Sequence, residues 1–322
     1  MRLLFCGTPQ FAVPTLQHLH AQPDFQIAAV VTQPDRPSGR GQQTSFSPIK
    51  ETALAANLPV FQPEKIRTPD SERFLREVNP DVIVIIAYGQ IIPARLLNIP
   101  KFGWINAHAS LLPKYRGAAP IQWAIASGET KTGVTTMRID AGMDTGDMLL
   151  QQEIPIAPDE NTPELVKRLA DLSANLMSQT LRGLRDGTLQ PKPQNNSEAT
   201  LAPLLKKEDG RIDWSQPAQA IYNRMRGFTP WPGAYTHFRG TICQLSGAPV
   251  PALESNVASA ASNSVERKLP AGQILLANDK ILVGCGEETL MGVSRVKVEG
   301  RKDVSALEFA NGAHLQPQER FD

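Results

Sequence analysis

The sequence has little of what marks secreted or membrane-spanning proteins. Its three cysteines, Cys6, Cys243 and Cys285, are odd in number and lie in apolar runs, which predicts buried thiols in a reducing compartment rather than disulfides or a zinc site. The N-terminal run MRLLFCGTP is too short for a signal peptide, and no uninterrupted apolar stretch approaches membrane-spanning length. We therefore expect a cytoplasmic protein that does not bind membranes.

Charge of one sign is not in excess either. Lysine and arginine total 33 and aspartate and glutamate 32, so the formal net charge at pH 7 is only +1. The overall balance therefore indicates neither nucleic acid nor an anionic membrane as a partner, and any basic surface must be local. The hydrophobic content of 41% is that of a globular protein, and 322 residues suffice for one large domain or two ordinary ones.

Residues 1–187 alternate short β-branched runs with helical segments. The run 82–87, apolar on both faces, is typical of a strand in a parallel sheet covered by helices on each side. This pattern predicts an α/β, Rossmann-like N-terminal domain. We expect strands near 2–7, 26–32, 81–89, 102–108, 132–140 and 147–154, and helices up to about residue 20, near 49–58, from residue 120, and between 162 and 187. The first strand ends in CGTP, which lacks the G-x-G-x-x-G spacing of a dinucleotide site.

The composition changes after residue 187. Residues 188–203, TLQPKPQNNSEATLAP, have no sustained periodicity and are rich in turn-forming residues, which predicts an interdomain linker. From residue 204 to 322, a helical segment around 217–226 is followed by short strand-like runs separated by turn signals, which predicts a C-terminal OB-like β-barrel domain. We interpret the polar stretch 252–268 as a surface insertion.

The segment INAHASLLPKYRG places Asn106 and His108 two residues apart at the end of an apolar run. Because side chains alternate along a strand, both project to the same side if the strand continues to His108. In open α/β sheets the ligand crevice lies beyond the carboxyl ends of the strands, where this run enters a loop. A single histidine near a strand end is more often structural than functional, so its neighbours decide the interpretation.

A second polar loop, RIDAGMDTGD, follows another predicted strand and holds Asp140, Asp144 and Asp147. Its spacing does not match a calcium-binding loop and no His or Cys cluster is near it in the sequence, so we do not expect a metal. The alternative is a carboxylate that orients an imidazole and handles a proton in an acyl-type transfer. In such a reaction an asparagine amide donates to the developing oxyanion.

These two stretches resemble the folate-dependent formyltransferases, on the residues NAHASLLPKYRGAAPIQWAI and GVTTMRIDAGMDTGDML. The resemblance implies that the catalytic asparagine, histidine and aspartate of that family fall on Asn106, His108 and Asp144. Further stretches (MRLLFCGTPQFAVP, TQPDRPSGRG, SPIK, FQPEKIR, RIDW and TPWPGAY) narrow it to the branch that formylates methionine on initiator tRNA for translation initiation. The match spans most of the chain.

The same resemblance implies the substrates. The formyl donor is expected to be 10-formyltetrahydrofolate, bound without a metal, and the acceptor the α-amino group of initiator methionyl-tRNA. The residues expected to line the folate site are Ser110, Leu111, Leu112 and Pro113. We expect the protein to act as a monomer.

For tRNA binding, the segment QPDRPSGRGQQTSFSPIK is by composition a solvated surface loop. The resemblance implies instead a loop that enters the acceptor stem, with Arg40 as the first contact and Arg36 as the next. Family members often carry lysines after GRG, where this chain has Gln42 and Gln43, which weakens the expected electrostatic contribution. Further candidate phosphate contacts are Lys206, Arg295 and Lys297, although a solvated barrel face is the alternative.

Two other functions remain as alternatives. A formyltransferase acting on a sugar-nucleotide amine, or a folate hydrolase domain, keeps the chemistry but should lack the DRPSGRG loop and the C-terminal barrel. A non-catalytic nucleic-acid-binding protein built on the barrel would have no need of all three polar catalytic positions.

Overall fold

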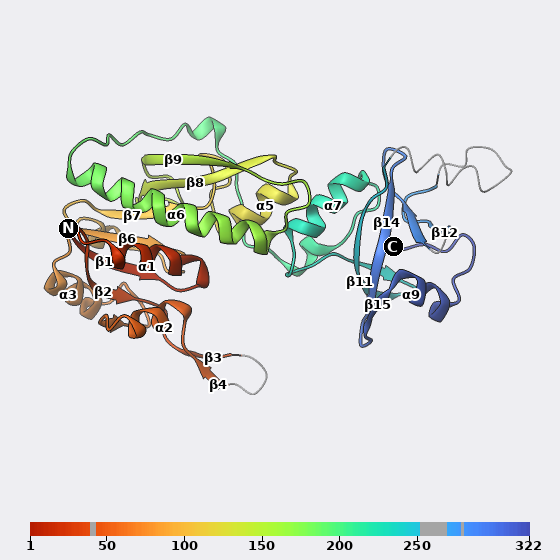
Figure 1. Cartoon of the computed structure of the whole chain (residues 1–322), viewed down its shortest axis with the longest axis horizontal. Coiled ribbons are helices and arrows are strands. Elements are labelled where there is room, and N and C mark those ends of the chain that lie inside the picture. Colours follow the sequence, from red (N-terminus) through yellow and green to blue (C-terminus); the bar gives the residue numbers. More distant parts are fainter. Residues whose placement is uncertain (39–42, 252–268, 278–279) are drawn as a thin grey trace. The chain divides into compact units, whose positions relative to one another are not determined.

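The computed structural model describes residues 1–38, 43–251, 269–277 and 280–322. The chain divides into two units (Figure 1). Unit 1 comprises Met1–Ile121, Lys131–Ile156 and Glu164–Pro203, and unit 2 comprises Gln122–Thr130, Ala157–Pro163 and Leu204–Asp322.

Unit 1 contains a seven-stranded sheet in the order β5-β2-β1-β6-β7-β8-β9. The first five strands of this order run parallel, whereas β8 and β9 are antiparallel to their neighbours. The fold is therefore α/β and Rossmann-like, as the sequence predicts. The strands are β1 (Arg2–Gly7), β2 (Gln26–Val31), β5 (Val60–Phe61), β6 (Val82–Ile86), β7 (Trp104–His108), β8 (Lys131–Arg138) and β9 (Met148–Pro155).

Both faces of this sheet are buried. One face packs with Leu75 of α3 and Leu96 of α4, and the strand residues there include Leu4, Cys6, Ile83 and Ile85. The alternate residues, including Leu3, Phe5, Val82 and Val84, are also fully buried, as expected for a parallel sheet covered on both sides. The helices encoded in this part of the chain are α1 (Val13–Ala21), α2 (Pro48–Ala55), α3 (Pro69–Val78), α4 (Ala94–Leu97), α5 (Pro120–Ala126) and α6 (Thr162–Arg185).

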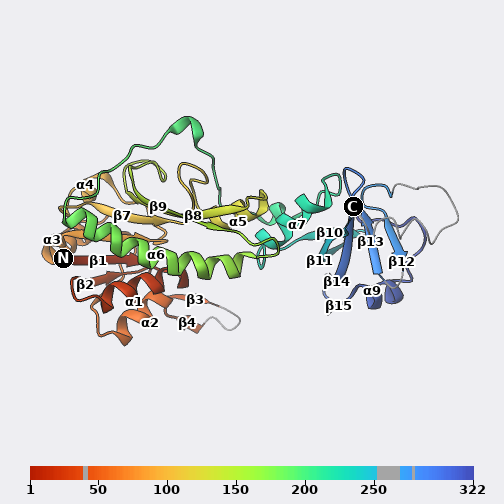
Figure 2. The same cartoon turned by 45° about the horizontal axis from the view of Figure 1, so that its top comes forward.

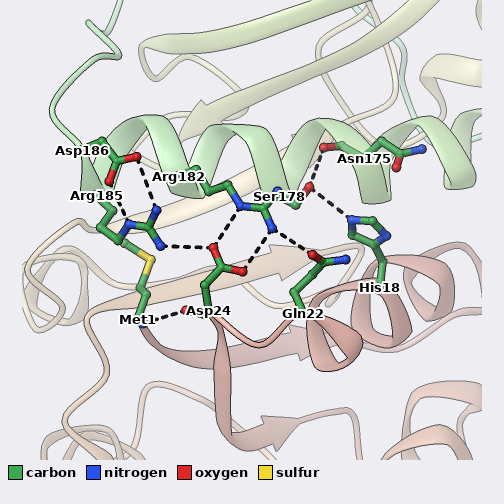
Figure 3. Close-up of polar contacts among 9 residues, drawn as sticks. All are labelled: Met1, His18, Gln22, Asp24, Asn175, Ser178, Arg182, Arg185 and Asp186. Atoms are coloured by element: carbon green, nitrogen blue, oxygen red, sulfur yellow. Dashed lines mark hydrogen bonds and ion pairs between the residues drawn. The ribbon is translucent and has the colours of Figure 1, made fainter.

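Helices α1 and α6 lie side by side along the sheet (Figure 2) and are joined by polar contacts (Figure 3). His18 of α1 is 3.1 Å from Ser178 Oγ through its Nε2. In the turn after α1, the Asp24 carboxylate accepts from Arg182 at 2.9 and 3.1 Å and from Arg185 at 3.1 Å. The hydrogen bond from Arg182 lowers the pKa of Asp24 to about 2, so this carboxylate is ionised in the folded protein at neutral pH.

The segment that composition describes as a surface loop contains a short antiparallel hairpin. Strand β3 (Arg36–Ser38) pairs with β4 (Gln43–Ser45), and Arg36 is opposite Ser45. At its base, Lys50 forms an ion pair with Asp35, and Gln62 Nε2 donates to Asp35 Oδ1 at 2.9 Å. A hairpin of this kind depends on backbone pairing and has no apolar alternation, so the sequence carries no periodic signal for it.

The segment 188–203 belongs to unit 1 and is bonded to other parts of that unit. Lys192 and Met148 exchange backbone hydrogen bonds at 2.8 and 2.9 Å, and the backbone N–H of Arg116 donates to Thr200 O at 2.8 Å. The segment also contains a short 3-10 helix, Asn196–Glu198. Its composition did not indicate that it is bonded at several points to the rest of unit 1.

Unit 2 is built on an antiparallel sheet in the order β10-β11-β14-β13-β12, with β15 paired to β14. Its core packs Trp214, Phe238, Phe309 and Phe321 with apolar residues of the strands, and Trp214 Nε1 donates to Thr236 Oγ1 at 3.1 Å. The C-terminal domain of antiparallel strands agrees with the sequence, and its OB-like closure stays a prediction. The elements are α7 (Ala218–Gly227), β10 (Tyr235–Phe238), β11 (Thr241–Pro249), β12 (Ile274–Ala277), β13 (Lys280–Gly284), β14 (Leu290–Val298), β15 (Asp303–Ser305) and α9 (Ala306–Ala313).

The three cysteines are free and buried, which confirms the predicted buried thiols. Burial raises the pKa of Cys285 to about 12 and also raises that of Cys6, so neither is a ready nucleophile at neutral pH. None of the helices in the described part of the chain is both long and apolar enough to cross a bilayer. The segment 252–268 lies outside the described residues.

Candidate active site

The candidate site begins at the carboxyl end of β7. This strand pairs parallel with β6, where Ile85 is opposite Asn106, and antiparallel with β8, where Thr135 is opposite His108. The strand thus continues to His108, and Asn106 and His108 lie on the same side of it, as the alternation predicts. Asn106 is half-buried, whereas His108 is only 6% exposed.

Both ring nitrogens of His108 face acceptors. Its Nε2 donates to the carbonyl oxygen of Tyr115 at 2.8 Å, and its Nδ1 is 3.6 Å from Asp144 Oδ2. The second distance is too long for a hydrogen bond, but it places a carboxylate where it would attract a protonated imidazole. Asp144 Oδ2 also accepts from the backbone N–H of Gly117 at 2.9 Å, which fixes the carboxylate beside the imidazole.

Asp144 reaches His108 through the loop between β8 and β9, not through the end of a neighbouring parallel strand. Because β8 runs antiparallel to β7, it ends with Arg138 opposite Ile105, near the beginning of β7 and away from His108. The loop 139–147 then returns, and Asp144 adopts a left-handed conformation with φ 54°. Of the three predicted catalytic residues, Asp144 thus approaches His108, and Asn106 lies on the same side of β7 as His108.

Asp140, another carboxylate of this loop, is bonded within the loop and not to His108. Asp140 accepts from Thr145 Oγ1 at 2.7 Å and from the Gly142 N–H at 3.0 Å, so it stabilises the loop itself. In the part of the chain that the structure describes, three or more His, Cys, Asp or Glu side chains are nowhere grouped as metal ligands would be.

The turn that the resemblance assigns to folate, residues 110–113, is held by buried hydrogen bonds. Ser110 Oγ donates to Lys114 O at 2.7 Å, so the Ser110 hydroxyl is engaged within the turn. Thr135 Oγ1 donates to Ser110 O at 2.7 Å and accepts from the Leu112 N–H at 3.1 Å. Ser110 and Leu112 are buried, whereas Leu111 and Pro113 are half-buried. The Ser110 hydroxyl, Ser110 O and the Leu112 N–H are therefore all engaged within the protein, and the apolar side chains of Leu111 and Pro113 are the partly exposed groups of the turn.

Sequence reasoning missed several residues that hold this site. Tyr115 contributes only its carbonyl oxygen and Gly117 only its N–H, so side-chain chemistry could not reveal them. Arg116, buried at 7% exposure, donates to Gln194 and Asn196. The signal in the sequence was that a glycine, Gly117, directly follows Arg116. In the structure this glycine has φ +123°, and a Cβ built on it would lie 2.7 Å from Ala202 O, so another residue here would be strained.

The predicted tRNA contacts lie on several elements. Arg36 is exposed at the start of β3 and Lys206 is exposed before a short 3-10 helix, whereas Arg40 lies outside the described residues. Arg295 and Lys297 are exposed on β14 with Val296 buried between them, so they share one face of the strand. Arg295 is ion-paired with Asp303 at 2.8 Å, and no ion pair involves Lys297 within the described ranges.

One further basic residue does not fit a phosphate-binding surface. Arg226 lies in the last turn of α7 and is only 8% exposed. Its guanidinium donates to Asn223 Oδ1 at 2.9 Å and to Glu160 O at 2.9 Å, and burial lowers its pKa. The sequence alone could not distinguish this interior arginine from a surface one.

Comparison of the sequence with known protein families assigns both parts of the chain to the formyl transferase family. The formyl transferase family model matches residues 1–181, and the model of the formyl transferase C-terminal domain matches residues 204–314. The chain is 53% identical to a methionyl-tRNA formyltransferase of Solibacter usitatus, covering 100% of this chain and 98% of that protein. It is 51% identical to one of Koribacter versatilis, covering 97% and 96%.

Solved structures show the same fold at low identity. A sugar 3N-formyl transferase, WlaRD, crystallised in the presence of dTDP and 5-N-formyl-THF, superposes with a TM-score of 0.62 at 16% identity, over 94% of this chain and 99% of that one. HypX from Aquifex aeolicus in complex with tetrahydrofolic acid has a TM-score of 0.58 at 17% identity, over 99% of this chain and 48% of HypX.

Proposed function

The chain belongs to the methionyl-tRNA formyltransferases of the formyl transferase family, and from this premise we propose the reaction that it catalyses. It transfers the formyl group of 10-formyltetrahydrofolate to the α-amino group of methionine on initiator methionyl-tRNA, and the product serves translation initiation. The observation that carries the proposal is identity of 53% over the whole chain. The approach of Asp144 to His108 at the end of β7 supports it.

In the proposed reaction the methionine nitrogen attacks the formyl carbon, a C–N bond forms, and the bond from that carbon to the folate nitrogen breaks. One proton leaves the amine and one reaches the folate nitrogen. The free amine needs no strong base, because an α-amino group has an ordinary pKa of about 8. The greater requirement is stabilisation of the oxyanion that forms at the formyl oxygen.

Asn106 is proposed to donate to that oxyanion. Its side-chain amide is half-buried at the end of β7, and among the described residues it has no hydrogen-bond partner, so it is available to a ligand. Loss of one such donor commonly raises a reaction barrier by about 3 kcal/mol.

His108 and Asp144 are proposed to act as a pair. Asp144 stabilises positive charge on the imidazole and orients it, while His108 donates to the reacting groups and relays a proton toward the folate nitrogen. In the structure the Nε2 of His108 donates to Tyr115 O, so donation to a substrate oxygen requires exchange of this hydrogen bond. The turn of residues Ser110–Pro113 is proposed to line the folate site.

The acceptor tRNA is proposed to contact Arg36, Arg40, Lys206, Arg295 and Lys297. Contacts of this kind to phosphates set affinity without reading base sequence. Of the two on β14, Lys297 is the stronger candidate because Asp303 already neutralises part of the charge of Arg295. We also propose that residues 1–187 form the catalytic domain and residues 204–322 the tRNA-binding domain, joined by residues 188–203, and that the protein is a cytoplasmic monomer.

The direct test is incubation of the purified protein with 10-formyltetrahydrofolate and methionine-charged initiator tRNA. Formylmethionine should be released on hydrolysis of the product, and uncharged tRNA should give none. A dTDP-linked amino sugar offered as the acceptor should remain unmodified. Formylation of the sugar but not of methionyl-tRNA would overturn the proposal.

A further inference from the structure

A side-chain amide in the segment 188–203 bridges two loops of the candidate active site. The Oε1 of Gln194 accepts from Nε and Nη2 of Arg116 at 3.0 and 2.8 Å. Its Nε2 donates to the backbone carbonyl oxygens of Asp144 and Gly146, both at 2.8 Å. One amide therefore contacts the loop that follows β7 and the loop between β8 and β9.

These contacts complete a ring around Asp144. The carboxylate of Asp144 is held by the N–H of Gly117 at 2.9 Å, and its carbonyl is held by Gln194. Gln194 in turn is held by Arg116, the residue next to Gly117. Asp144 is thus fixed at its side chain by Gly117 and at its backbone by Gln194, and Gln194 is itself bonded to Arg116, the neighbour of Gly117.

The chemistry of the ring requires an amide. A guanidinium has only donors and a backbone carbonyl has only acceptors, so the residue between them must accept at one end and donate at the other. A glutamate at this position would bring an acceptor against two carbonyl oxygens. Without Gln194, the buried guanidinium of Arg116 would retain only Asn196 Oδ1, at 2.8 Å, among its side-chain partners in the described residues.

The backbone on each side of Gln194 is anchored, to the start of β9 on one side and to the loop that follows β7 on the other. Toward the N-terminus, Lys192 and Met148 exchange hydrogen bonds at 2.8 and 2.9 Å. Toward the C-terminus, the Ala202 N–H donates to Arg116 O at 2.7 Å. The amide is therefore presented from a fixed backbone, as a positioning group requires.

We propose that Gln194 is a positioning residue for formyl transfer, whose amide holds the Asp144 loop against the Arg116 loop and so sets the separation of Asp144 from His108. The inference rests on the proposed function, since it assigns Gln194 to the same reaction. Among the described residues, no hydrogen bond joins Gln194 to the Asp144 carboxylate or to His108, so it acts through the backbone of Asp144.

The test compares Gln194→Glu with Gln190→Glu, the same chemical change at an exposed residue of the same segment. Gln194→Glu should lower kcat about tenfold to a hundredfold, because misplacement of a catalytic group by about 1 Å has effects of this size. KM for 10-formyltetrahydrofolate should change less than about threefold, since the folate turn is untouched. Gln190→Glu should match the wild type in both.

A double variant distinguishes positioning from a general structural role. In the Asp144→Asn background, Gln194→Glu should lower kcat less than about threefold further, because the carboxylate that it positions is already gone. An additive loss would overturn the proposal, as would a normal kcat in Gln194→Glu. If a thermal melt shows that Gln194→Glu does not fold, Gln194→Met, which is similar in shape and uncharged, takes its place with the same expectations. A wild-type protein inactive toward methionyl-tRNA would refute the proposed function instead.

Discussion

Replacement of Asp144 by asparagine isolates the charge that this residue places beside His108. The substitution keeps the shape of the side chain, and the Gly117 N–H, now 2.9 Å from Oδ2, can still donate to the asparagine oxygen. The backbone contacts with Gln194 are also kept. What is lost is the negative charge 3.6 Å from His108 Nδ1.

The size of the loss follows from this distance. Two unit charges about 3.6 Å apart interact by about 4–5 kcal/mol at an effective dielectric constant of about 20. The side chain of Asp144 is 19% exposed and that of His108 6%, so solvent screening reduces the interaction to about 2–3 kcal/mol. If the charge stabilises the imidazole in the transition state, formyl transfer should slow about 30- to 150-fold.

Single-turnover kinetics, with enzyme in excess over methionyl-tRNA, measures this step directly. The thermal unfolding midpoint and the equilibrium binding of tetrahydrofolate serve as controls, and both should stay close to those of the wild type. A single-turnover rate within about threefold of the wild type would refute the reasoning. Asp144 would then have a structural role in its loop.

Three further predictions concern other parts of the protein. Asn106→Ala should lower the single-turnover rate on the order of a hundredfold or more but leave tetrahydrofolate affinity nearly unchanged, because the oxyanion exists only along the reaction path; equal losses in both would contradict the role. Asp24 has a lowered pKa of about 2, so its stabilisation is present above the unfolded value and fades as the pH falls toward 2. Urea denaturation should show Asp24→Asn less stable by about 1 kcal/mol at neutral pH, after allowance for exposure, with the difference shrinking between about pH 5 and pH 3; a pH-independent difference would exclude this linkage. Lys297→Ala should weaken tRNA binding and reduce the slope of log K against log salt by about 0.7–0.9, and an unchanged slope would remove Lys297 from the phosphate contacts.

Much of the fold was accessible from local patterns. The run 82–87 is apolar on both faces, and its first five residues, Val82–Ile86, form the fully buried strand β6. The position of Asn106 and His108 on one side of β7 follows from alternation alone, because that geometry involves residues two apart on one strand. The β3–β4 hairpin was not predicted, since its short strands carry no alternation. The antiparallel direction of β8 was not apparent either, because a strand's sequence does not state its direction.

The family, the α/β class and the Asn106–His108 pair could be read from the sequence, since each rests on local motifs or on short-range alternation. Asp144 entered the candidate set with Asp140 and Asp147 through the loop RIDAGMDTGD, and the family resemblance then selected it from the three. How Asp144 meets His108, and that Gln194 belongs with them, became apparent from the three-dimensional structure. Gly117 and Asp144 are 27 residues apart, Asp144 and Gln194 50, and Arg116 and Gln194 78. Such hydrogen bonds depend on how the loops fold and on which distant segments of the chain come together, and no periodicity in the sequence encodes either.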